Sequence, residues 1–108
     1  MCDFQTLYHN DTIGYVVRCS ECAKLQIGFG NLMLTFHEED FGPFTAWIHS
    51  LKEEQHPSQS KSLRCITIPT PCEGMKLLLS INELEDLSAM LEAADTELQS
   101  LAMLELFK

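Results

Sequence analysis

Basic residues are scarce in this sequence. The chain of 108 residues has seven Lys and Arg against sixteen Asp and Glu, which gives a formal charge of −9. A protein that binds nucleic acid or an anionic membrane needs a basic surface to neutralise phosphates. The composition therefore argues against nucleic acid and anionic membranes as partners.

Apolar runs of membrane-spanning length are also missing. No stretch approaches the ~18 consecutive apolar residues that a membrane-spanning helix needs. The first residues, Met1 to Phe4, lack both the charged segment and the apolar segment of a secretion signal. We therefore expect a cytoplasmic protein.

Nothing in the composition indicates disorder. Hydrophobic residues make up 45% of the chain and charged residues 21%, the ordinary balance of a globular protein. A length of 108 residues is enough for one core without a disulfide or a metal as an obligatory staple. We expect a single domain over residues 1–108.

The chain begins with strand patterns. Phe4 to His9 and Ile13 to Arg18 read as two strands. The residues between them, Asn10 to Thr12, have turn chemistry. This order predicts a first hairpin, with Asn10-Asp11 or Asn10 to Thr12 as its turn.

A second hairpin has the clearest local pattern. Apolar residues alternate before and after Gly30-Asn31, a pair that supplies the positive φ of a two-residue turn. If this turn forms, six apolar side chains lie on one face of the sheet. The predicted opposing pairs are Phe29 with Leu32, Ile27 with Leu34, and Leu25 with Phe36.

A helix is predicted after His37. The acids Glu38 to Asp40 suit the first turn of a helix, and apolar residues continue at helical spacing as far as Leu51. Gly42-Pro43 interrupts this pattern near its start. The polar segment Glu53 to Lys61 reads as a linking loop.

The last third of the chain predicts a third hairpin and a long helix. A β-branched run, Cys65 to Ile68, leads through a proline-containing loop into Met75 to Leu79. Ser80 to Glu83 form a capping box at the start of the helix. An apolar stripe with a seven-residue pattern follows, made of Leu84, Leu87, Leu91, Ala94, Leu98 and Leu101.

The order strand, strand, helix occurs twice. A shift that places Cys22 on Cys65 also places Leu25 on Ile68. Any two units of this kind share such a pattern, so a duplicated ββα unit is only one reading of it. With or without duplication, the order predicts an α+β fold, an antiparallel sheet of about six strands with two helices on one face.

Five cysteines are many for this length. Cys19 and Cys22 form a C-x-x-C pair, a spacing that lets two thiolates bind one zinc ion. The expected first hairpin places Cys2 beside Cys19. Cys65 or Cys72 supplies a fourth thiol if the third hairpin docks nearby. The pattern thus predicts a structural zinc site with at most four of the five cysteines as ligands.

Two other interpretations of the cysteines stay open. Free cysteines are among the most buried residue types and often serve as small apolar core residues. The other alternative is a thiol-based redox protein or enzyme that uses Cys19 and Cys22. Redox pairs of this spacing depend on a helix N-terminus to lower the thiol pKa, whereas a strand, Leu25 to Phe29, follows here.

Catalytic residues are not evident. The four histidines fall in turn, helix and loop segments, where solvated or capping roles are expected; they are His9, His37, His49 and His56. No nucleophile elbow, phosphate loop or paired-acid signature is present. We therefore expect a non-enzymatic protein and assign no catalytic residue.

The end of the C-terminal helix is apolar around more than one face. A helix that lies on a sheet needs only one apolar face. The excess, from Leu98 to Phe107, either packs on the first helix or contacts a second copy of the protein. We expect a homodimer through this helix, with another protein as the alternative partner.

One run of residues resembles a known family. Val17 to Cys22 (VRCSEC) and its continuation Leu25 to Asn31 (LQIGFGN) are similar to a family of small bacterial proteins of unknown function. That family has no established activity, so the resemblance assigns no catalytic residue. It implies a small standalone bacterial protein.

Overall fold

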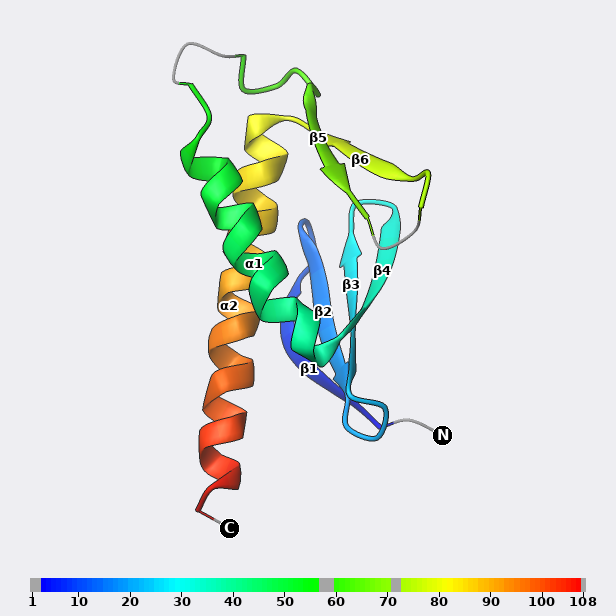
Figure 1. Ribbon diagram of the computed structural model, residues 1–108, viewed down its shortest axis with the longest axis vertical. Coiled ribbons are helices and arrows are strands. Elements are labelled where there is room, and N and C mark those ends of the chain that lie inside the picture. The colour runs from blue at the N-terminus through cyan, green and yellow to red at the C-terminus, as the bar shows by residue number, and fades with distance from the viewer. Residues whose placement is uncertain (1–2, 57–59, 71–72, 108) are drawn as a thin grey trace.

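The computed structural model describes residues 3–56, 60–70 and 73–107 (Figure 1). Its elements follow in the order β1 (Phe4–Asn10), β2 (Gly14–Cys19), β3 (Lys24–Phe29), β4 (Leu32–His37), α1 (Glu38–Glu53), β5 (Ile66–Pro69), β6 (Lys76–Leu79) and α2 (Ile81–Glu105). The fold is α+β, as the sequence predicts. Neither of these two helices combines the length and the apolarity that crossing a membrane requires.

The first four strands form an antiparallel sheet in the order β1-β2-β3-β4. Its β3–β4 hairpin has the predicted register, with Phe29 opposite Leu32 and Leu25 opposite Phe36. Gly30 has a φ of +61°, which suits the first central position of a type II′ turn. The most local of the sequence predictions is thus confirmed.

The first hairpin differs from its predicted register. Its loop is residues 11–13, because Asn10 pairs with Gly14. The side-chain Oδ1 of Asn10 accepts hydrogen bonds from the backbone N–H of Thr12 at 2.9 Å and of Ile13 at 3.1 Å, which stabilises the longer loop. An irregularity between Thr6 and Tyr8 shifts the register again. Both predicted turns are therefore wrong by one or two residues.

The predicted single sheet of six strands is also wrong. Strands β5 and β6 pair only with each other and form a separate two-stranded sheet. Alternate residues of this hairpin, such as Ile68 and Leu77, are buried in the common core. The hairpin therefore packs its apolar face on the core and does not extend the four-stranded sheet by further strands. The elements still follow the order of two ββα units, but the two units differ in sheet architecture and duplication is not confirmed.

The two helices cover one side of the four-stranded sheet. Helix α1 contacts β3 and β4, α2 contacts β1, β2 and β6, and the helices pack against each other (Figure 1). Helix α1 continues through Pro43, although this residue lacks a backbone N–H. The capping box of α2 is confirmed, since Ser80 and Glu83 exchange side-chain to backbone hydrogen bonds.

The core lies between the sheet and the helices. Val16, Leu25 and Ile27 come from the sheet, Phe41 and Ile48 from α1, and further leucines from the first half of α2. On the other face of the sheet, the ring of Tyr15 lies across Gly28, where an added Cβ would come within 2.2 Å of the ring. The apolar alternation of the strands thus decides which face of the sheet meets the helices, and the β2–β3 turn at one end of the sheet carries Cys19 and Cys22.

Candidate functional site

The loop between β2 and β3 holds the C-x-x-C pair, and we call residues 19–24 the cysteine turn. Cys19 ends β2 and pairs with Lys24 at the start of β3. Ala23 has a φ of 55°, in the left-handed region that non-glycine residues seldom adopt. The Sγ atoms of Cys19 and Cys22 lie 3.0 Å apart. Cys19 is buried and Cys22 is exposed, so the turn presents one accessible thiol with a buried thiol behind it.

The start of α1 contacts the cysteine turn. The backbone N–H of Glu38 donates a hydrogen bond to the carbonyl oxygen of Ala23 at 2.8 Å. The carboxylate of Glu38 also lies 3.3 Å from Nη2 of Arg18. Although a strand follows Cys22 in sequence, a helix N-terminus therefore lies beside the turn in space. Acidic side chains in the first turn of α1 offset the positive end of the helix dipole there.

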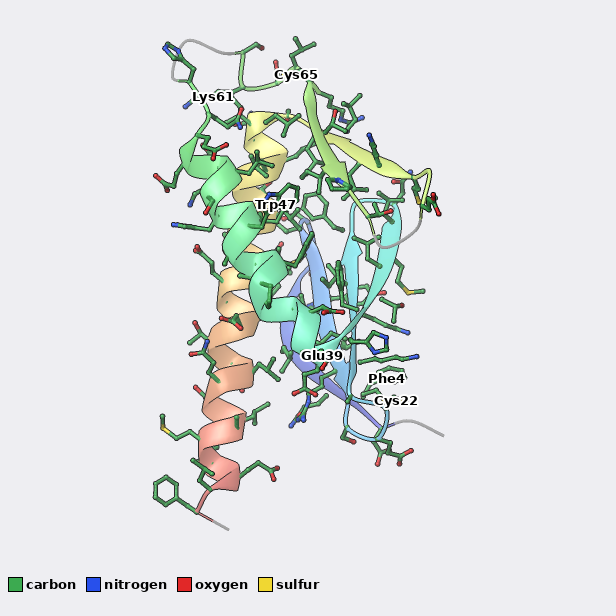
Figure 2. All side chains as sticks on the ribbon, viewed as in Figure 1. Phe4, Cys22, Glu39, Trp47, Lys61 and Cys65 are labelled. Carbon is green, nitrogen blue, oxygen red and sulfur yellow. The ribbon has the colours of Figure 1, made fainter. Side chains whose placement is uncertain are left out.

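A cavity of ≈ 460 Å³ adjoins the exposed thiol. It is lined by Cys22, Ala23, His37, Glu38 and Glu39. Figure 2 shows Cys22 and Glu39 at the same end of the molecule. A small molecule that reaches Cys22 through this cavity meets two carboxylates on the way.

The predicted zinc ligands are only partly brought together. Cys19 and Cys22 are adjacent, whereas Cys65 is exposed and lies toward the opposite end of the molecule (Figure 2). Within the described residues, no three His, Cys, Asp or Glu side chains are grouped so that they could hold a metal ion. Cys2 and Cys72 lie outside those residues. In the sheet Cys19 pairs with Phe4, so the predicted register that placed Cys2 beside Cys19 is wrong. A zinc site that includes Cys2 stays a prediction without that support.

The sulfur separation itself bears on the zinc prediction. In a tetrahedral site with Zn–S bonds of ~2.3 Å, two sulfur ligands lie roughly 3.8 Å apart. A disulfide holds them at ~2.05 Å. The observed 3.0 Å falls between these values. If the two sulfurs share the shift, each moves by roughly 0.5 Å or less on conversion to either form.

The histidines do not gather around the cysteine turn as a group. His49 Nδ1 lies 2.6 Å from Glu92 Oε1, across the α1–α2 contact. His9 lies 3.6 Å from Asp11 in the first hairpin loop. His37 is the N-cap residue of α1, but its side chain makes no capping hydrogen bond. The side chain is exposed, so of the two expected roles, solvated or capping, the solvated one applies to this residue.

A second cavity, of ≈ 380 Å³, is mainly apolar. It lies between β4, α1 and the end of β5, and is lined by Thr35, Phe36, His37, Asp40, Phe44, Trp47, Pro69 and Thr70. The rings of Phe36 and Phe44 are 4.6 Å apart between centroids, and those of Phe44 and Trp47 are 6.3 Å apart. Helical periodicity places Phe44 and Trp47 on an apolar face but gives no signal for this cavity, because three separate elements form it.

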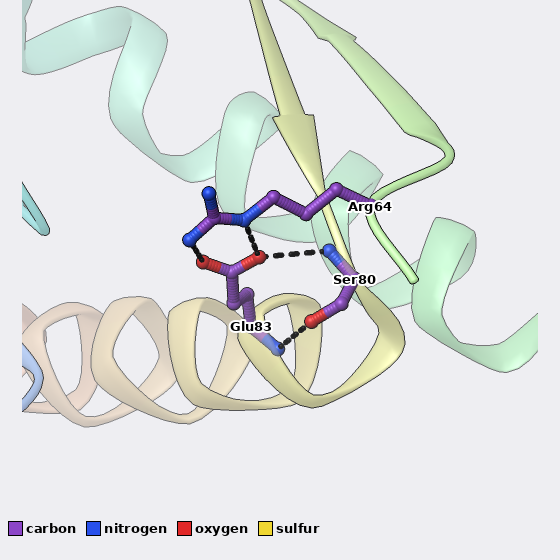
Figure 3. A network of polar contacts seen from close by, with 3 residues as sticks. All are labelled: Arg64, Ser80 and Glu83. Carbon is purple, nitrogen blue, oxygen red and sulfur yellow. Dashed lines mark hydrogen bonds and ion pairs between the residues drawn. The ribbon is translucent and has the colours of Figure 1, made fainter. Parts of the chain in front are cut away.

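The start of α2 carries the clearest polar network (Figure 3). Arg64 binds Glu83 through two hydrogen bonds, Nε to Oε1 at 2.9 Å and Nη2 to Oε2 at 3.0 Å. Ser80 donates its backbone N–H to Glu83 Oε1 at 3.0 Å, and Ser80 Oγ accepts the backbone N–H of Glu83. The hydrogen bonds and charge of Arg64, with the N–H of Ser80, hold the pKa of Glu83 below its usual value.

This network has a structural role. The guanidinium of Arg64 gains the same contacts, and its pKa is raised. The backbone N–H of Asn82 also donates to the carbonyl of Lys61, so the segment before β5 is tied to the first turn of α2. Sequence patterns identify the capping box but not Arg64, which lies in a loop without periodicity.

The C-terminal part of α2 is the least covered element. Ala94 is its last buried residue, and Leu98 and Leu101 are only partly buried. Large apolar side chains beyond them are exposed: Met103 (63%), Leu104 (61%), Leu106 (81%) and Phe107 (81%). We call Leu98, Leu101 and these four residues the apolar tail. Figure 1 shows that this end of α2 runs past the sheet.

Comparison with known proteins gives a family and no activity. No curated protein matches the chain. No solved structure matches it either. The sequence resemblance to a family of unknown function is nevertheless confirmed. The model of a family of unknown function, DUF6686, matches residues 1–106, so the chain belongs to that family.

Proposed function

We propose that the chain is an interaction domain, not an enzyme, and that it self-associates through the apolar tail of α2. The observation that carries this proposal is the exposure of four large apolar side chains after the last buried residue of the helix. We further propose that it acts in the cytoplasm, where an odd number of cysteines is compatible with reduced thiols.

The length of α2 supports a partner. A helix of 25 residues is ~38 Å long, and residues 81–94 account for all of its buried positions within the described part of the chain. An isolated helical end of this length is marginal in water unless an apolar face is covered. A second copy covers the apolar tail with an identical apolar tail, which gives a two-fold interface.

Charge sets the conditions under which this dimer forms. The chain carries a formal charge of −9, and the last turn of α2 contains no basic residue. Two copies therefore repel each other at low salt, and added salt screens this repulsion. The dimer is thus expected to tighten as the salt concentration rises. A complex with a basic partner protein would weaken under the same conditions.

Sedimentation velocity over a range of protein and salt concentrations tests the proposal. We expect a concentration-dependent dimer for the wild type, and a monomer for Leu104→Gln combined with Phe107→Gln. Leu63→Gln is the matched control, because Leu63 is equally exposed (62%) but lies outside the helix. A wild type that stays monomeric at every concentration and salt level contradicts self-association. Equal dimerisation of the double variant contradicts the role of the apolar tail.

A further inference from the structure

The cysteine turn carries a second inference, independent of self-association. Its two sulfur atoms lie 3.0 Å apart in a single short loop. This separation is roughly 0.8 Å shorter than two zinc-bound sulfurs require and roughly 1 Å longer than a disulfide bond. Two thiols at this distance in a four-residue span have a high effective concentration toward each other.

We propose that Cys19 and Cys22 are an oxidation site, which forms a reversible intramolecular disulfide by exchange with a low-molecular-weight disulfide. The exposure of the two residues assigns the order of the steps. Cys22 is exposed and borders a cavity open to small molecules, whereas Cys19 is only 3% exposed. Cys22 therefore reacts first with the external disulfide, and Cys19 resolves the product.

The exchange balances without a further reactant. The Cys22 thiolate attacks one sulfur of the disulfide RSSR, which forms a mixed disulfide and releases RS⁻. The Cys19 thiol then loses its proton and attacks Sγ of Cys22, which forms the Cys19–Cys22 bond and releases a second RS⁻. The two protons lost by the cysteines convert the two RS⁻ to RSH. The protein loses two electrons and RSSR gains them.

The surroundings of the turn allow this bond to form without disturbing the sheet. Cys19 and Lys24 hold the ends of β2 and β3 together by strand pairing, which does not involve the thiols. Ala23 already has the left-handed conformation that reverses the chain. The two sulfur atoms need to approach by roughly 1 Å to reach the length of a disulfide bond.

The cavity beside Cys22 also indicates the kind of disulfide that fits. Glu38 and Glu39 line it. Arg18 offsets part of the charge of Glu38, but Glu39 and the net charge of −9 leave the surroundings acidic. The carboxylates repel an anionic disulfide and attract a cationic one. We therefore use cystamine, which carries two amino groups, as the probe.

The first experiment isolates the pair. A chain with Cys2→Ser, Cys65→Ser and Cys72→Ser retains only Cys19 and Cys22, and circular dichroism checks that it folds as the wild type does. After treatment with cystamine and then N-ethylmaleimide, intact mass spectrometry is expected to show a loss of two hydrogens, with neither cysteamine nor maleimide added. Accumulation of a Cys22–cysteamine adduct, or alkylation of both thiols, overturns the proposal.

Two single changes in this background assign the roles. With Cys19→Ala, the exposed Cys22 is expected to hold one cysteamine that no second thiol removes. With Cys22→Ser, a change of similar size at an exposed position, Cys19 is expected to react far more slowly than Cys22 does. Equal rates for the two thiols overturn the assigned order.

The zinc alternative is measured on the wild type. Elemental analysis of untagged protein purified without added metal is expected to give no bound zinc, and the Cys19–Cys22 disulfide should form without a chelator. Near one zinc per chain, with thiols that react only after chelation, overturns the proposal and establishes a metal site instead.

Discussion

The two halves of α2 share one periodic pattern but have different surroundings. Residues 81–94 place Leu84, Leu87 and Leu91 in the core, with almost no exposed surface. Residues 95–105 continue the stripe through Leu98 and Leu101, yet none of them is buried. The comparison shows that periodicity identifies the apolar face of a helix, but the length of the neighbouring sheet decides how much of that face is covered.

The contacts at the two ends of α2 follow the same division. The first half begins with a capping box and with the two-bond contact from Arg64 to Glu83. The last turn has no basic side chain to complement the negative end of the helix dipole. The first half is therefore the stable anchor of the helix, and the second half is the part available for association.

Truncation of a core leucine should show the largest difference between the halves. Leu91→Ala is expected to lower the free energy of unfolding by about 2–5 kcal/mol, because a fully buried side chain leaves a cavity. Urea unfolding followed by circular dichroism measures this loss. A change as small as that of an exposed residue would show that Leu91 is not part of a packed core.

Removal of the N-cap should have the next largest effect. Ser80→Ala deletes the oxygen that accepts the backbone N–H of Glu83, and is expected to cost about 1 kcal/mol. Ser100→Ala, in the exposed second half of the same helix, is the control for the serine-to-alanine change. Equal effects of the two changes on the urea midpoint would contradict the assigned difference between the halves.

The pH dependence of stability should depend on Glu83. Its pKa is lower in the folded chain than its usual value, so its contribution is fully present above the unfolded pKa and is lost as the pH falls through the folded pKa. Glu83→Gln is therefore expected to destabilise the chain at neutral pH, and less so in acid below the usual carboxyl range. Unfolding curves of both proteins across this pH range provide the measurement. A constant difference between them would contradict the role of the charge.

Local signals in the sequence predict the local parts of this fold. Gly30-Asn31 and the apolar alternation around it predict the β3–β4 register, and Ser80 to Glu83 predict the start of α2. Each depends on residues within a few positions of one another. The first hairpin differs from its prediction because the Asn10 side chain stabilises a longer loop, and composition alone does not distinguish the two loop lengths.

Contacts between distant segments could not be predicted. Whether β5 pairs with β4 or packs its apolar face on the core depends on the whole fold. The same holds for the cysteines, since the C-x-x-C spacing predicts that Cys19 and Cys22 meet, whereas the position of Cys65 follows from the separate hairpin. The contact between Ala23 and Glu38 is likewise invisible in sequence, although it brings the start of α1 to the cysteine turn.

The smallest effect on stability is expected in the apolar tail. Leu104→Ala removes an exposed side chain, so it should change the free energy of unfolding of the dilute monomer by less than about 0.5 kcal/mol. At higher protein concentration the wild type should gain stability from dimer formation, by mass action, and the variant should gain less. Thermal unfolding over a concentration series separates these two contributions. A melting temperature that is independent of concentration in both proteins would mean that no second copy covers the exposed half of α2, and a basic protein partner would then be the better candidate.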